Sequence, residues 1–136
     1  MTPKEMSELH SQCMNGYQIW SEAYYKELLE SKTSIFKLSS FGFGCARLIK
    51  DEAEILMVLI KPTARRNGHA TLILKKLTEE LQSLGCKQIH LEVAATNKKA
   101  IALYLKNNFH CIGKRSKYYS LESGNKVDAL VLKINF

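Results

Sequence analysis

The sequence predicts a single α/β domain over residues 1–136, in which helices flank a mixed β-sheet. Two kinds of apolar pattern interleave along the chain: residues that recur at helical spacing, and short runs that are continuous or alternate as strands do. A length of 136 residues with 46% hydrophobic content suits one domain with a two-layer or three-layer core. The chain holds no internal repeat, low-complexity segment or linker.

The first half of the chain is expected to contain two helices and three strands. The first helix is predicted from Pro3 to Cys13, and the second from Glu22 to Glu30 with Ser21 as its N-cap. Strands are predicted over residues 34–38, 41–50 and 55–60. The third of these is a continuous apolar run, which indicates burial on both faces. Pro62 ends it, because proline lacks a backbone donor.

The second half is expected to contain two helices and three strands as well. A long helix runs from about Gly68 to Leu84, and Gly85 is the residue expected to end it. A shorter helix over 97–106 has Asn97 at its start. The turn at 123–125, Ser-Gly-Asn, precedes the last strand. The three strands are predicted over residues 88–94, 109–115 and 128–134.

The six residues from Arg65 to Ala70, Arg-Arg-Asn-Gly-His-Ala, join a strand to the start of the long helix. The first N–H groups of a helix have no helical partner, and the helix dipole favours negative charge there. Gly68 and Ala70 keep the turn free of bulk, so a pyrophosphate could approach its backbone. The alternative is a basic loop that merely begins a helix, because short glycine motifs often match by chance.

Further motifs follow in a fixed order, and together they resemble the GNAT acetyltransferases. They are Arg-x-x-Gly-x-Ala from Arg65, Leu-Glu-Val from Leu91, and Asn-x6-Tyr from Asn97 to Tyr104. The resemblance is dense from about Ala53 to Tyr119. It implies a GNAT fold with a mostly antiparallel sheet that lacks the family's usual first strand, and acetyl-CoA as co-substrate. The cofactor contacts that it implies are Val58, Leu59, Ile60, Arg66, Asn67, Gly68, His69, Ala70, Thr71 and Asn97.

The resemblance also assigns the two proton-transfer roles. Glu92 is the candidate general base, and a carboxylate among apolar strand residues is costly to bury without a purpose or a partner. Its alternative is a paired or rim carboxylate, with His90 on the same strand face as one possible partner. Tyr104 is the candidate acid for the departing thiolate. Its alternative is a packed tyrosine whose hydroxyl bonds to a backbone group.

The acceptor is expected to be a protein N-terminus. Within the family, the chain most resembles the enzymes that acetylate the N-terminal alanine of a small-subunit ribosomal protein, in which tandem tyrosines like Tyr118-Tyr119 flank the acceptor. The alternative for this pair is ordinary strand alternation, in which one tyrosine points into the protein and the other points out to solvent. Roughly 10–20% of α-amines are neutral at pH 7, whereas under about 0.1% of lysine side chains are. Only the neutral amine is a nucleophile, so a carboxylate base has less work to do on a chain terminus, which weakly favours that acceptor. A lysine or small-amine acetyltransferase and a non-catalytic basic RNA-binding domain remain open.

Net charge and cysteine usage set further expectations. The charge is +7, and five basic residues without an acid lie between Ile55 and Thr78, which favours a phosphate-rich ligand. No nucleic-acid-binding module accompanies this charge, so direct nucleic-acid binding is not expected.

The four cysteines form no Cys-x-x-Cys pair, which is typical of reduced thiols in a cytoplasm, and no metal-ligand spacing occurs. No apolar run approaches the roughly 20 residues of a membrane span.

Overall fold

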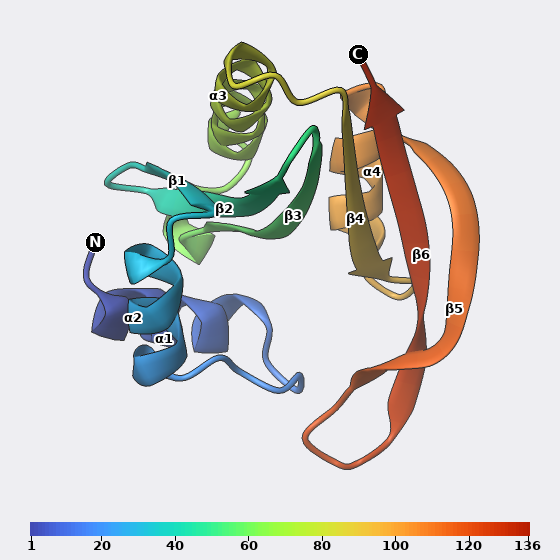
Figure 1. Ribbon diagram of the computed structural model, residues 1–136. Helices are drawn as coiled ribbons and strands as arrows, with labels where there is room; N and C mark the ends of the chain where they lie inside the picture. The colour runs from blue at the N-terminus through green and yellow to red at the C-terminus, as the bar shows by residue number, and fades with distance from the viewer.

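The computed structural model describes residues 1–136 and has four α-helices and a six-stranded sheet (Figure 1). The predicted order of helices and strands is confirmed. The α-helices are α1 (Pro3–Cys13), α2 (Glu22–Glu30), α3 (His69–Ser83) and α4 (Lys98–Lys106), with a short 3-10 turn η1 (Pro62–Ala64). The strands are β1 (Ser34–Leu38), β2 (Gly42–Ile49), β3 (Glu52–Ile60), β4 (Gln88–Ala94), β5 (His110–Ser120) and β6 (Lys126–Asn135).

The sheet is mixed and mostly antiparallel, with the strand order β1-β2-β3-β4-β6-β5. Only the β3–β4 pair is parallel. At one edge β1 pairs with β2 alone, so its outer edge is unpaired, and β5 forms the opposite edge. The long β5–β6 hairpin extends beyond the end of β4 (Figure 1).

The parallel pair β3–β4 is joined over only a short stretch and then separates. Its paired residues run from Glu52 opposite Gln88 to Glu54 opposite His90. Beyond this point the two strands diverge (Figure 1), and Leu56 forms a bulge against β2 between the paired residues Ile55 and Met57. The backbone groups of β3 that face the gap therefore lack a strand partner, which makes them available to a ligand.

The expectation that the apolar run 55–60 is buried on both faces is wrong for its middle. Ile55, Leu59 and Ile60 are buried, but Leu56, Met57 and Val58 are only half-buried. The physical reason is the divergence of β3 from β4, which leaves this stretch without a neighbour on one side. A continuous apolar run here marks a strand that lines a cavity.

Two hydrophobic cores lie on opposite faces of the sheet. Side chains of α1 and α2 pack with Phe43, Cys45 and Leu59 in one core. Side chains of α3 and α4 pack with Ala46 and with residues of β3 and β4 in the other. Gly44 allows α3 to lie close to β2, because an added Cβ would stand 2.7 Å from the Ile73 side chain. The domain thus has three layers, with the diverging strands in the middle one.

Local signals set the helix ends where the sequence predicts them. Ser21 accepts from the N–H of Tyr24 at the start of α2, and Asn97 accepts from the N–H of Ala100 at the start of α4. Gly68 and Gly85 flank α3 with φ angles of 79° and 89°. None of the helices has both the length and the apolar character needed to cross a membrane.

The C-terminal strands are longer than predicted. β5 runs to Ser120, whereas the sequence pattern ends it at Arg115. Its pairing with β6 shifts register between Arg115 and Tyr119, and Lys117 within this bulge has a φ of 50°. Because the bulge interrupts strict alternation, the pattern of side chains conceals the continuation of the strand.

Candidate active site

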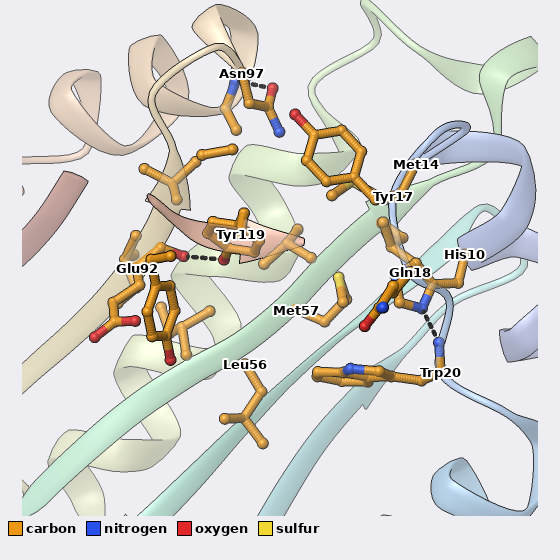
Figure 2. A pocket seen from close by; sticks show the side chains of 18 of the residues that line it. His10, Met14, Tyr17, Gln18, Trp20, Leu56, Met57, Glu92, Asn97 and Tyr119 are labelled. Carbon is orange, nitrogen blue, oxygen red and sulfur yellow. Dashed lines mark hydrogen bonds between the residues drawn. The ribbon is translucent and has the colours of Figure 1, made fainter. Parts of the chain in front are cut away.

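Two cavities meet where β3 and β4 diverge. The first, of about 420 Å³, lies between the two strands and is also lined by residues 10–20 and by the end of β5 (Figure 2). The second, of about 510 Å³, lies between the end of β3, the start of α3 and α4. Both are lined by Val58, Leu59, Asn97 and Tyr104, so the two cavities adjoin at these residues.

The second cavity is built for an anion. Arg65, Arg66 and Lys99 line it together with the first turn of α3, whose N–H groups have no helical partner. Gly68 precedes this turn in the left-handed conformation, and a Cβ placed on it would meet nothing within 4 Å. Positive side chains, unpaired N–H groups and an unobstructed backbone fit a pyrophosphate.

Nine of the ten predicted cofactor residues line the second cavity. They are Val58, Leu59, Ile60, Arg66, Gly68, His69, Ala70, Thr71 and Asn97. Asn67 does not line it. Its side-chain amide donates at 3.2 Å to the carbonyl oxygens of Ala64 and Arg65 and so stabilises the turn. The ring of His69, which also lines this cavity, stacks on Phe41 with the centroids 4.1 Å apart.

Glu92 on β4 lines the first cavity and is paired there. Its side chain is 14% exposed, and its Oε1 lies 3.0 Å from Nε of Arg115. The hydroxyl of Tyr118 faces the same carboxylate, and this hydrogen bond and the negative charge raise the pKa of Tyr118. The pairing alternative for Glu92 is therefore present in the structure, and Glu92 itself lines the cavity. His90 contacts Glu54 at 3.5 Å, so it is not the partner of Glu92.

The tandem tyrosines both line the first cavity. Tyr119 donates its hydroxyl to the backbone oxygen of Glu92 at 2.7 Å (Figure 2), and burial raises the pKa of Tyr119 to about 12. Tyr118 is 47% exposed and Tyr119 is half-buried, as the alternative of one outward and one inward side chain expects, but their ring centroids are 5.7 Å apart and both rings line the cavity. The bulge at Lys117 breaks the alternation of β5, so both rings reach the same cavity.

Tyr104 on α4 stands at the junction of the two cavities. Its side chain is buried, and burial raises the pKa of Tyr104 far above its usual value. The hydroxyl forms no hydrogen bond within the chain, so the alternative of a tyrosine bonded to a backbone group does not apply. A protonated hydroxyl without an internal partner is free to donate to a ligand at this junction.

Sequence reasoning missed one wall of the first cavity. The segment between α1 and α2 supplies Met14, Tyr17, Gln18 and Trp20, and α1 supplies His10 (Figure 2). The hydroxyl of Tyr17 lies 2.9 Å from Oγ1 of Thr96, which connects this segment to the loop before α4. Aromatic residues in an irregular segment were the available signal, but nothing local indicates which cavity they reach.

Cysteines and potential metal ligands are scattered. All four cysteines are free thiols, and Cys45 and Cys86 are buried. No group of three or more His, Cys, Asp or Glu side chains is placed to hold a metal ion.

Comparison with curated proteins gives relatives of a single kind. The [ribosomal protein bS18]-alanine N-acetyltransferase of Escherichia coli K12 is 29% identical over 119 residues, which is 85% of this chain and 80% of that protein. The enzyme of the same name from Haemophilus influenzae is 34% identical over 91 residues, 67% of this chain and 62% of that one.

Solved structures share the fold. The crystal structure of the ribosomal-protein-S18-alanine N-acetyltransferase from E. coli has a TM-score of 0.82 at 24% identity and covers 95% of this chain and 84% of its own. Arabidopsis thaliana NAA60 in complex with acetyl-CoA has a TM-score of 0.84 at 15% identity, and the match covers 98% of this chain and 93% of that one. The family profile described as "Acetyltransferase (GNAT) family" matches residues 4–109. The chain thus belongs to the GNAT family of N-acetyltransferases, and among these enzymes it is similar to the RimI type.

Proposed function

We propose that the chain transfers the acetyl group of acetyl-CoA to the N-terminal α-amine of a protein, with alanine as the acceptor residue and a small-subunit ribosomal protein as the substrate. The observation that carries this proposal is the meeting of the two cavities at Tyr104. One cavity suits a phosphate-bearing cofactor, and the other is lined by Tyr17, Tyr118 and Tyr119 together with apolar side chains. The curated relatives carry the name of a bS18-alanine N-acetyltransferase, which supports the choice of acceptor. We take residues 1–136 as one catalytic domain.

The second cavity provides what acetyl-CoA requires. The pyrophosphate would lie on the N–H groups that follow Gly68, with Arg65 and Arg66 beside it. The pantetheine arm would use the free backbone of Val58 to Ile60, which the divergence of β3 and β4 leaves unpaired. When bound, acetyl-CoA supplies the thioester carbon that the amine attacks. Free thiols in the chain fit a reducing compartment such as the cytoplasm.

Two side chains would move the protons of the reaction. Glu92 would accept the proton of the α-ammonium through a water molecule, and Arg115, 3.0 Å away, holds this carboxylate in place. Tyr104 would donate its proton to the thiolate that leaves, since its raised pKa keeps the hydroxyl protonated at every working pH. Tyr118 and Tyr119 would flank the first residues of the acceptor.

Acetyl-CoA is expected to raise the melting temperature of the protein, and Gly68→Val is expected to abolish most of that rise. Gly68 lines the second cavity, where the pyrophosphate would lie, so an added side chain is expected to obstruct the approach of the phosphates. Differential scanning fluorimetry over an acetyl-CoA titration measures both quantities. Gly85→Val is the matched control: Gly85 lies at the other end of α3 with a similar φ of 89°, so it introduces the same backbone strain far from the cavity. Equal loss of the shift in both variants would place the cofactor elsewhere.

Acceptor choice tests the function itself. A peptide that begins with a free alanine is expected to be acetylated at its α-amine, whereas the same peptide with a blocked terminus and internal lysines is not. Mass spectrometry of the products locates the acetyl group. Spermidine is expected to be a poor substrate, since it offers no peptide backbone to the tyrosines. If the blocked peptide or spermidine reacts as fast as the free terminus, the chain is a lysine or small-amine acetyltransferase.

A further inference from the structure

Two side chains of α1 hold the backbone of Trp20 from both sides. Ser7 Oγ donates to the carbonyl oxygen of Trp20 at 2.8 Å, and the N–H of Trp20 donates to Nδ1 of His10 at 3.2 Å. Ser7 and His10 are three residues apart, so they lie on one face of the helix. Together they satisfy both polar backbone groups of Trp20 and so fix the position of the residue that precedes Ser21, the N-cap of α2.

The hydrogen bonds define the protonation state of His10. A backbone N–H can only donate, so Nδ1 must carry its lone pair and the proton of the neutral ring must be on Nε2. The hydroxyl of Tyr25 lies 3.1 Å from the same Nδ1 and donates to it as well. His10 is only 2% exposed, and burial lowers its pKa to about 4, so the ring stays neutral. Its edge also contacts the ring of Trp20 at a centroid distance of 5.5 Å.

The segment that His10 fixes crosses from α1 to the β5–β6 hairpin. Tyr17 forms a bridge with Leu121, and the N–H of Glu122 donates to the carbonyl oxygen of Gly16 at 2.9 Å. The middle of the segment thus contacts the hairpin, and its end at Trp20 is bonded back to α1. Met14, Tyr17, Gln18 and Trp20 of this segment form the wall of the first cavity opposite Glu92 (Figure 2).

We infer that His10, assisted by Ser7, is a positioning residue that holds this wall in shape for the acceptor, acting as a neutral imidazole with its proton on Nε2. The inference rests on the proposed function in that the first cavity is taken as the acceptor site. His10 is not a general base, because the N–H of Trp20 and the hydroxyl of Tyr25 share its one lone pair on Nδ1. Its removal should therefore affect how the acceptor binds and leave the cofactor cavity unchanged.

Three variants test this role. His10→Leu fills the space but leaves the N–H of Trp20 and the hydroxyl of Tyr25 without an acceptor. His10→Asn places Oδ1 where Nδ1 stands. Ser7→Ala removes the hydrogen bond to the carbonyl oxygen of Trp20. His10→Leu is expected to raise the KM of the alanine peptide about five- to tenfold, as the loss of a buried hydrogen bond implies, with kcat changed less than about twofold. The melting-temperature rise with acetyl-CoA should persist. His10→Asn should restore most of the KM, and Ser7→Ala should raise it by a smaller factor.

Hydrogen exchange of the free protein gives a readout that needs no activity. Peptides covering residues 17–21 should exchange faster in His10→Leu than in the parent, with His10→Asn close to the parent and the β4 peptides unchanged. If His10→Leu and His10→Asn have the same KM and the same exchange, the acceptor at Nδ1 has no positioning role. Failure of His10→Leu to fold leaves Ser7→Ala to decide by the same two measurements. If the parent acetylates no peptide, the proposed function fails, and the exchange data still decide the role of His10.

Discussion

Tyr104→Phe is expected to lower kcat by about 10²- to 10³-fold, the usual range for loss of a general acid. The departing thiolate needs a proton at every pH, and the raised pKa of Tyr104 keeps its hydroxyl protonated throughout the working range. The loss should therefore be constant from about pH 6 to about pH 9, because no other group titrates into the role. Initial rates with the alanine peptide across that range measure the profile.

The substitution removes one oxygen from a buried ring that already packs against Phe109, with centroids 5.6 Å apart, so the fold should be preserved. The hydroxyl has no partner within the chain, and its loss leaves no protein group unsatisfied. The melting temperature without ligand and the rise with acetyl-CoA should both stay near the parent values. A variant that keeps the parent's kcat would show that the thiolate takes its proton from water.

The parts of the fold that local sequence signals govern could be predicted. The caps Ser21 and Asn97 and the glycines at both ends of α3 set the helix bounds, and each acts within a few residues along the chain. The same holds for the start of α3, where a turn and a helix N-terminus adjoin in sequence and therefore also in space. Glu92, Asn97 and Tyr104 fall within one strand–helix unit, so a motif can identify all three.

The parts that depend on tertiary placement could not be predicted. Arg115 meets Glu92 across β6: Glu92 pairs with Val131, and Arg115 pairs with Ala129 on the other side of that strand. No spacing along the chain encodes this contact. The wall made by Tyr17 and Trp20 is likewise set by long-range contacts. Even the divergence of β3 from β4 was hidden, because the half-buried middle of β3 is as apolar as a fully buried strand.

Glu92→Gln is expected to lower kcat/KM for the alanine peptide by about 10²-fold near pH 7 and by less at higher pH. An α-amine with a pKa of about 7.7–8.0 is mostly protonated at pH 7, so a base must remove its proton before attack. Above about pH 8 most of the amine is already neutral, and the variant should recover part of the lost rate. The kcat/KM values of Glu92→Gln and of the parent should therefore approach each other as the pH rises. The rates of Tyr104→Phe and of the parent should instead differ by the same factor at every pH.

Glu54→Gln provides the matched comparison, because Glu54 is the other carboxylate that lines the first cavity. It is 42% exposed and contacts His90, whereas Glu92 is 14% exposed and pairs with Arg115. Because Glu54 is more exposed, at the last residue of β3 that pairs with β4, solvent screens its charge, and its loss should reduce kcat/KM by less than about fivefold at any pH. Should Glu54→Gln show the pH-dependent loss and Glu92→Gln not, the base would be Glu54. In that case the Glu92–Arg115 pair would serve to hold the wall of the cavity and the tyrosines attached to it.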